Sequence, residues 1–257
     1  MNWRLKRKLF LISLGTIILF LLGFLFYLKF KPIPEACFDG KKNFDEEDID
    51  CGGSCPPCEL KKFIPLRQYE TKFLIYDNKT FDLLGLVENP NKNLALKKLR
   101  YQFYIYDKQG ILRATTSIRE TILLPEEKRY LFELNKSLPE FEIGNVALII
   151  FKPDKNDWLK FEKKDPIKIQ IYNFKKNREN NQWKISFTLY NPLITAYNDI
   201  GLVLLFYDQK GDLITVSETN FSLAEEETKE LIINLPPLKE EPFAYNYQFQ
   251  LSILPDQ

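Results

Sequence analysis

The feature that most constrains the fold is an internal repeat in the C-terminal part of the chain. Asn89-Pro90 recurs as Asn191-Pro192, 102 positions later. Other pairs keep an offset of 99 to 102, namely LRYQFYIYDKQGIL (99–112) with IGLVLLFYDQKGDL (200–213), LPEEK (124–128) with LAEEE (223–227), and IIFKP (149–153) with LSILP (251–255). Two units of about 85–90 residues follow, 70–154 and 166–257, and each is long enough to fold alone.

The sequence of both units predicts β-strands. Apolar residues alternate with polar ones over 99–106 and again over 183–189, and period-two alternation places one face of a strand on a core. We count six or seven such strands in each unit and no long helix after residue 28. The pattern favours an all-β fold of two tandem β-sandwiches.

Repeated polar residues mark the turns between these strands. Asp opens a type I turn, Gly supplies the positive φ that leads into the next strand, and Asn before Pro closes a turn. We therefore interpret these positions as structural rather than as a shared binding site: Asn89, Asp107, Gly110, Asn191, Asp208 and Gly211.

Short motifs in the repeat resemble known domain families. Phe103-Tyr104-Ile105-Tyr106-Asp107 resembles the F-x-L-Y-D motif of a bacterial and archaeal β-sandwich family, and the second copy keeps Tyr207-Asp208. GLVENPN (85–91) is similar to the strand and turn of group 2 late embryogenesis abundant domains. The resemblance implies an immunoglobulin- or fibronectin-like sandwich of about seven strands and no defined catalytic activity.

The N-terminal segment predicts a single transmembrane helix. Residues 9–28 are free of charged side chains, and 20 residues span roughly 30 Å, the thickness of a bilayer core. A cleaved signal peptide is the main alternative, although its apolar region is shorter. Ala36-Cys37 faintly resembles a lipoprotein cleavage site.

The basic residues around this segment predict its orientation. Four lie before it and two after it, so we expect 1–8 to form a cytoplasmic tail and the remaining chain to lie outside the cytoplasm. The expected localisation is a single-pass, N-terminal anchor in the cell membrane, with the bilayer contacted through 9–28.

All four cysteines fall within 37–58, spaced C-x13-C-x3-C-x2-C. In an oxidising compartment they would form two disulfides, for which three connectivities exist. A four-thiolate zinc site is the alternative, but only one C-x2-C pair suits it. We favour disulfides among Cys37, Cys51, Cys55 and Cys58.

Acidic residues are dense between these cysteines. The side chains of Asp39, Asn43, Glu46, Asp48 and Asp50 could supply oxygen ligands to calcium, but the spacing is not that of an EF-hand. A solvated charged loop is the interpretation we favour. The whole segment also resembles a DCGG-x-C-type motif of predicted prokaryotic surface proteins, which implies an extracytoplasmic location and no activity.

The composition argues against several classes of function. The chain has no His, which removes the commonest general base and metal ligand, and no nucleotide or hydrolase motif is present. Residues 1–31 carry a charge of +6, and the whole chain has a net charge of +1. The remaining residues therefore carry −5, which does not suit nucleic-acid binding.

We therefore expect a non-enzymatic protein without a cofactor that presents two sandwiches to partners, here other proteins of the cell envelope. The first alternative is a ligand- or calcium-binding sensor that uses the acidic cysteine segment. The remote alternative is a Ser-Lys hydrolase. Sequence leaves open the partner, the oligomeric state and the disulfide connectivity.

Overall fold

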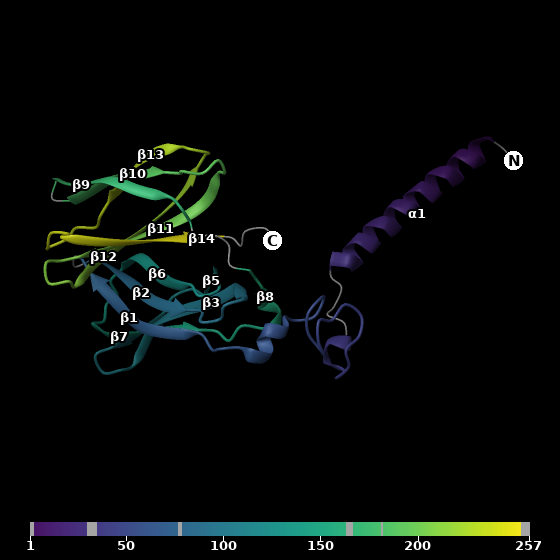
Figure 1. Ribbon diagram of the computed structural model, residues 1–257, viewed down its shortest axis with the longest axis horizontal. Coiled ribbons are helices and arrows are strands. Elements are labelled where there is room, and N and C mark those ends of the chain that lie inside the picture. Colours follow the sequence, from purple (N-terminus) through teal and green to yellow (C-terminus); the bar gives the residue numbers. More distant parts are fainter. Residues whose placement is uncertain (1–2, 30–34, 77–78, 163–166, 181, 253–257) are drawn as a thin grey trace. The chain divides into compact units, whose positions relative to one another are not determined.

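A computed structural model describes residues 3–29, 35–76, 79–162, 167–180 and 182–252 of the chain (Figure 1). The chain divides into two compact units, Met1–Cys58 and Glu59–Gln257. The predicted sandwich ranges 70–154 and 166–257 both belong to the second unit. Residues 1–2 of the predicted tail and residue 166 lie outside the described residues.

The first unit begins with helix α1, Trp3–Lys29. Among the described residues, none of the helices combines the length and the apolar character that a bilayer crossing needs. The predicted membrane span over 9–28 is therefore wrong, and so are the single-pass localisation and the fold class that included it.

Short 3₁₀ helices flank the cysteine segment. They are η1, Glu35–Phe38, and η2, Cys58–Lys62. Glycines 40, 52 and 53 take positive φ values, as do Phe44 and Asp50, so the chain turns repeatedly within a few residues. A segment of this length buries too little apolar surface to hold such turns by packing, and it depends on covalent cross-links instead.

The first sandwich consists of two antiparallel sheets. One has the order β1-β2-β6, and in the other the long central strand β3 pairs with β4, β5, β7 and β8. The strands are β1 Arg67–Ile75, β2 Thr80–Glu88, β3 Leu94–Asp107, β4 Leu112–Thr115, β5 Arg119–Leu123, β6 Lys128–Ser137, β7 Ile143–Ile150 and, after the 3₁₀ helix η3 Lys155–Asp157, β8 Trp158–Lys160.

The second sandwich repeats this plan with fewer strands. Its sheets have the orders β13-β10-β9 and β12-β11-β14. The strands are β9 Gln170–Glu179, β10 Gln182–Tyr190, β11 Tyr197–Tyr207, β12 Leu213–Leu223, β13 Thr228–Asn234 and β14 Ala244–Leu251. Strand by strand, β9-β10-β13 corresponds to β1-β2-β6, and β11 with β14 corresponds to β3 with β7. The prediction of two related β-sandwiches is confirmed.

Each sandwich has its own core, formed by the inward faces of its two sheets. Phe103 of β3 and Leu83 of β2 are fully buried in the first, and Phe187 of β10 and Phe206 of β11 are almost fully buried in the second. Trp158, which lies between the two repeat units in sequence, belongs to the first core and meets Phe63 edge-on at 5.0 Å.

The two sandwiches also pack against each other. The outer face of the β1-β2-β6 sheet meets the outer face of the β12-β11-β14 sheet, and we call this contact the seam. Strand β11 is therefore buried on both faces, with its even-numbered residues in the core and Val203 and Leu205 in the seam. The seam is a small apolar cluster of Leu84, Phe132, Val203, Leu205 and Val216.

Candidate binding site

The cysteine segment is cross-linked twice. Cys37 bonds to Cys55 and Cys51 bonds to Cys58, and no free cysteine remains. The predicted disulfides are confirmed, and this connectivity is one of the three that the sequence left open. With all four sulfurs oxidised, no thiolate is left to bind zinc, so the alternative of a zinc site is wrong.

The acidic side chains of this segment mostly accept hydrogen bonds within it. Asp39 accepts from Lys41 N and Asn43 Nδ2, and both oxygens of Asp50 accept from Gly40 N. Glu46 is buried and accepts from Asn43 N, while its Oε1 lies 3.3 Å from Cys55 Sγ, a disulfide sulfur with no proton to donate. The Oδ1 atom of Asn43 is buried without a hydrogen-bond partner.

The repeated asparagines hold corresponding loops together. Asn89 is fully buried and donates from Nδ2 to the carbonyls of Leu94 and Leu124. Asn191 is fully buried in the same way and donates to the carbonyls of Thr195 and Ala224. In both copies one side-chain amide joins the loop after a central strand to the polar loop that contains the Leu-Pro-Glu-Glu or Leu-Ala-Glu-Glu sequence.

The repeated aspartates cap the turns that follow β3 and β11. Asp107 Oδ1 accepts from Gln109 N and Ile111 N at 2.9 Å, and Asp208 Oδ1 accepts from Lys210 N and Asp212 N at 2.8 and 2.9 Å. Gly110 and Gly211 take φ values of +78° and +85°. These four residues lie in turns of separate sandwiches and form no common site.

The seam brings together polar residues that the sequence does not connect. Tyr76 follows β1 of the first sandwich but packs into the core of the second, together with Leu74. Its hydroxyl donates to Asp82 Oδ2 of β2 and accepts from Thr215 Oγ1 of β12 at 3.2 Å. Asp82 Oδ1 accepts from Asn135 N at 2.6 Å. One tyrosine therefore joins three strands from both sandwiches.

Burial changes the ionisation of this network. Desolvation raises the pKa of Asp82, and its hydrogen bonds to Tyr76 and Asn135 offset only part of that shift. Burial and the neighbouring Asp82 carboxyl also raise the pKa of the Tyr76 phenol. Both shifts favour the protonated form of the group relative to the unfolded chain.

A second set of hydrogen bonds crosses the seam from β6. Arg129 is 4% exposed, and its guanidinium donates to Glu127 Oε1, Thr121 Oγ1 and the Leu251 carbonyl of β14, the last at 2.8 Å. Nearby, Arg119 forms a two-point contact with the fully buried Glu133. Burial raises the pKa of Glu133, but hydrogen bonds from Arg119 and Lys136 outweigh it, so the pKa falls below its usual range.

Beside these hydrogen bonds the seam opens into a polar groove of about 560 Å³. Hydroxyl, amide and carboxyl groups from both sandwiches line it, including Thr80, Asp82, Asn135, Ser217, Glu218, Thr219 and Asn234. Its described lining contains two acidic side chains and no basic one. Glu218 is exposed, but partial desolvation in the groove raises the pKa of its carboxyl, although Arg119 and Arg129 act in the opposite direction.

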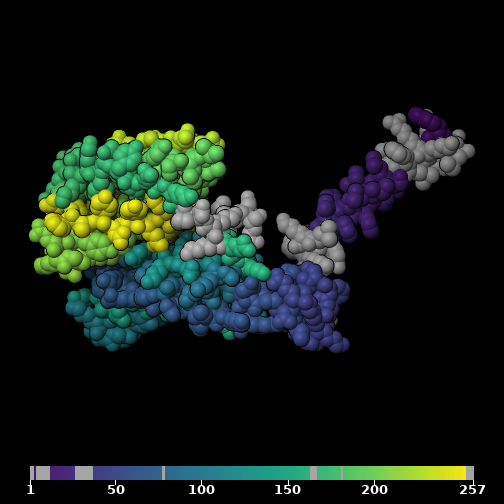
Figure 2. All heavy atoms as spheres, viewed as in Figure 1, coloured from purple at the N-terminus to yellow at the C-terminus, as the bar shows by residue number. Residues whose placement is uncertain are grey.

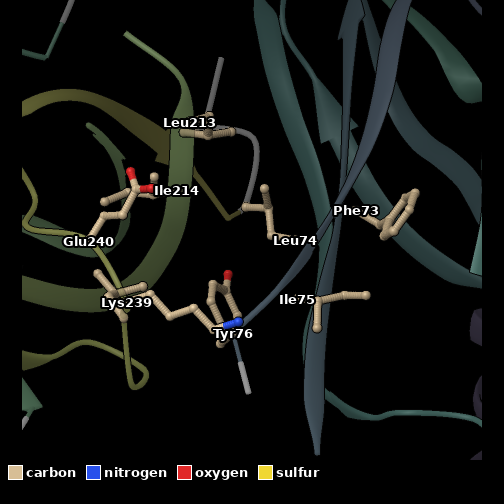
Figure 3. A pocket seen from close by; sticks show the side chains of 9 residues that line it. Phe73, Leu74, Ile75, Tyr76, Leu213, Ile214, Lys239 and Glu240 are labelled. Carbon is tan, nitrogen blue, oxygen red and sulfur yellow. The ribbon is translucent and has the colours of Figure 1, made fainter. Parts of the chain in front are cut away.

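A smaller, more apolar hollow of about 280 Å³ lies at the end of β1 (Figure 3). Leu74 and Tyr76 point from the strand toward Ile214, whereas Phe73 points to the other side and packs in the first core. Lys239 and Glu240 complete the lining with one charge of each sign. The alternation of β1 thus divides its side chains between the two sandwiches.

Sequence reasoning missed the groove and the seam. The one available signal was in β11, where Ile200–Phe206 is apolar without interruption, a pattern typical of a strand buried on both faces. Tyr76, Asp82, Glu218 and Arg129 carry no local signal, because their role depends on strands that lie far apart in the chain.

Comparisons with known proteins leave the family open. No protein-family model matches the chain, and no curated protein matches its sequence. Among solved structures, a transglutaminase from red sea bream aligns with 75% of this chain and 30% of its own, at 9% identity and a TM-score of 0.24. The chain thus spans less than a third of that enzyme. The resemblance to F-x-L-Y-D and late embryogenesis abundant domains stays a prediction.

Proposed function

We propose that the chain is a non-catalytic binding protein whose paired sandwiches hold a basic group of a partner polypeptide in the polar groove. The observation that carries this proposal is the lining of the groove, which has the carboxyls of Asp82 and Glu218 and no basic side chain among its described residues. A bound ammonium or guanidinium group would compensate the desolvation that raises both pKa values.

The wider charge distribution supports the same kind of partner. Residues 32–257 carry a net charge of −5, obtained as +1 for the chain minus +6 for residues 1–31. Such a field attracts basic segments over distances of about 10 Å at ordinary ionic strength. Ser217 and Thr219 lie in the groove, but no lysine lines it, so the lining supplies no Ser-Lys pair for hydrolysis.

Binding of a labelled peptide tests this function. We expect an octapeptide of alternating Lys and Ser to bind the full chain, and the Glu–Ser peptide of equal length not to bind. Glu218→Gln should weaken binding by about tenfold, the cost of one charged contact. Glu225→Gln, an exposed acid in a turn of the same sandwich, is the matched control and should bind as the wild type does. Equal affinity of the two peptides would refute the proposal.

The second candidate function is calcium binding by the cysteine segment. The buried, unpartnered Oδ1 of Asn43 favours it, because a carbonyl oxygen without a donor is a ligand that calcium accepts. Asn43 also contacts Asp39 and Glu46 through its two donor groups. Calorimetry with calcium chloride tests this hypothesis, and Asn43→Ala should abolish the heat. No heat with the wild-type chain would refute it.

A further inference from the structure

Strand β14 differs from the other strands that lie at sheet edges. Among the described strands it pairs with β11 alone, over eight consecutive positions without a register shift. Its sequence, AYNYQFQL, contains no charged side chain. Charges and bulges are the usual devices that stop an edge strand from pairing with another chain, and the described part of β14 has neither.

The remaining edges are protected. Strands β1 and β9 contain lysine and arginine and are interrupted by register shifts, and β13 contains Lys229 and Glu230. Strand β7 is also uncharged, but its pairing with β3 contains a register shift. Among the described edge strands, β14 is therefore the one with neither a charged side chain nor a register shift.

The hydrogen bonds of β14 indicate which of its backbone groups face outward. The Tyr247 amide donates to the side chain of Asn246, and the Leu251 carbonyl accepts from Arg129, so neither group is used in the ladder with β11. In an antiparallel strand the outward groups belong to alternate residues. The amides and carbonyls of Tyr245, Tyr247 and Phe249 therefore face away from β11.

Exposed aromatic rings surround this edge. Tyr245 and Tyr247 are 41% and 43% exposed, and Phe243 just before the strand is 63% exposed. Tyr245 stacks on Phe174 of β9 with ring centroids 3.8 Å apart, which holds its ring in place. Figure 2 shows the yellow atoms of this part of the chain as a continuous band on the surface of the second sandwich.

We propose that β14 is a dimerisation edge at which a second copy of this chain adds its own β14 in antiparallel pairing. The two three-stranded β12-β11-β14 sheets would become one six-stranded sheet. A two-fold interface uses the same patch on both copies, so it requires a strand that does not repel itself. The uncharged β14 meets this requirement, whereas charged β1, β9 and β13 would place like charges near each other.

Sedimentation of the full chain in a mild detergent tests the proposal. We expect the wild type to be a dimer at micromolar concentration. Tyr247→Lys places like charges beside the proposed interface in both copies and should raise the dimer dissociation constant by about tenfold or more. Tyr247→Thr introduces an uncharged, β-branched residue that suits a strand and should dimerise more strongly than the lysine variant.

Ile232→Lys is the matched control, because Ile232 is 65% exposed on the charged edge strand β13. It should dimerise as the wild type does. Self-association through the exposed apolar side chains of α1 would be equal in all variants, so only a difference between them reports on β14. A monomeric wild type, or equal dissociation constants for the wild type and Tyr247→Lys, would overturn the proposal.

Discussion

The Tyr76 hydroxyl lies 3.2 Å from Thr215 Oγ1, a contact between residues 139 positions apart that belong to different sandwiches. The same hydroxyl donates to Asp82, so its removal leaves a buried carboxyl with one partner fewer. We expect Tyr76→Phe to lower the free energy of unfolding by about 1–3 kcal/mol in urea denaturation. Tyr69→Phe, which removes a hydroxyl bonded to Glu88 at the surface, should cost less than about 0.5 kcal/mol.

The raised pKa of Asp82 gives a pH dependence of a definite sign. A carboxyl whose pKa is higher in the folded state stabilises the fold fully below its unfolded pKa, near 3.8, and this contribution is lost as the pH rises through the folded value. Asp82→Asn removes this dependence. The wild type should therefore lose stability relative to Asp82→Asn as the pH rises from about 4.

The difference between the two proteins is the quantity to measure, by melting temperature at a series of pH values. Glu133 has a lowered pKa, so its contribution is present above its unfolded pKa and is lost as the pH falls, which is the opposite sign. Glu133 is common to both proteins and cancels in the difference. A difference that does not change between pH 4 and 7 would contradict the assignment for Asp82.

Arg129 should not tolerate replacement by lysine. Its planar group donates to three separate acceptors in a nearly dry site, and lysine cannot reproduce that geometry. We expect Arg129→Lys to destabilise the chain by about 2–4 kcal/mol. The exposed Arg67→Lys provides the comparison and should stay within about 0.5 kcal/mol of the wild type in the same denaturation experiment.

The repeated asparagines should behave alike. Asn191→Ala leaves the carbonyls of Thr195 and Ala224 without their donor in a buried loop, and Asn89→Ala does the same in the first sandwich. Each should cost about 2–3 kcal/mol. Asn177→Ala, at an exposed position of β9, should change little. Losses below about 0.5 kcal/mol for both buried variants, which is the range of ordinary surface substitutions, would contradict the structural role of this pair.

Reduction should unfold the cysteine segment alone. The 18-residue separation of Cys37 and Cys55 corresponds to about 3 kcal/mol of cross-link stabilisation in a segment with little core. Hydrogen exchange of 37–58 should accelerate after treatment with a phosphine reductant. The sandwiches form the other compact unit and contain no cysteine, so their exchange should not change. Faster exchange in β10 or β11 would contradict this independence.

Part of this structure could be predicted because the information is local. The alternation over 99–106 fixes which side chains of β3 face the core, and the repeat predicts a second sandwich related to the first. The Asp-x-x-Gly turns are equally local, since Asp107 bonds amides only two and four positions away. The N-terminal span was predicted in the same local way, yet among the described residues no helix meets the requirement for crossing a membrane.

By itself the sequence determined the two sandwiches and the turn residues between their strands, because period-two hydrophobicity and residue spacing act over short distances. Only the tertiary structure decided which cysteines pair and which outer faces meet. It placed Tyr76, Asp82 and Arg129 at a seam, and it left β14 as an uncharged edge. The seam depends on contacts between strands more than 100 positions apart, such as Arg129 with Leu251, for which no local pattern exists.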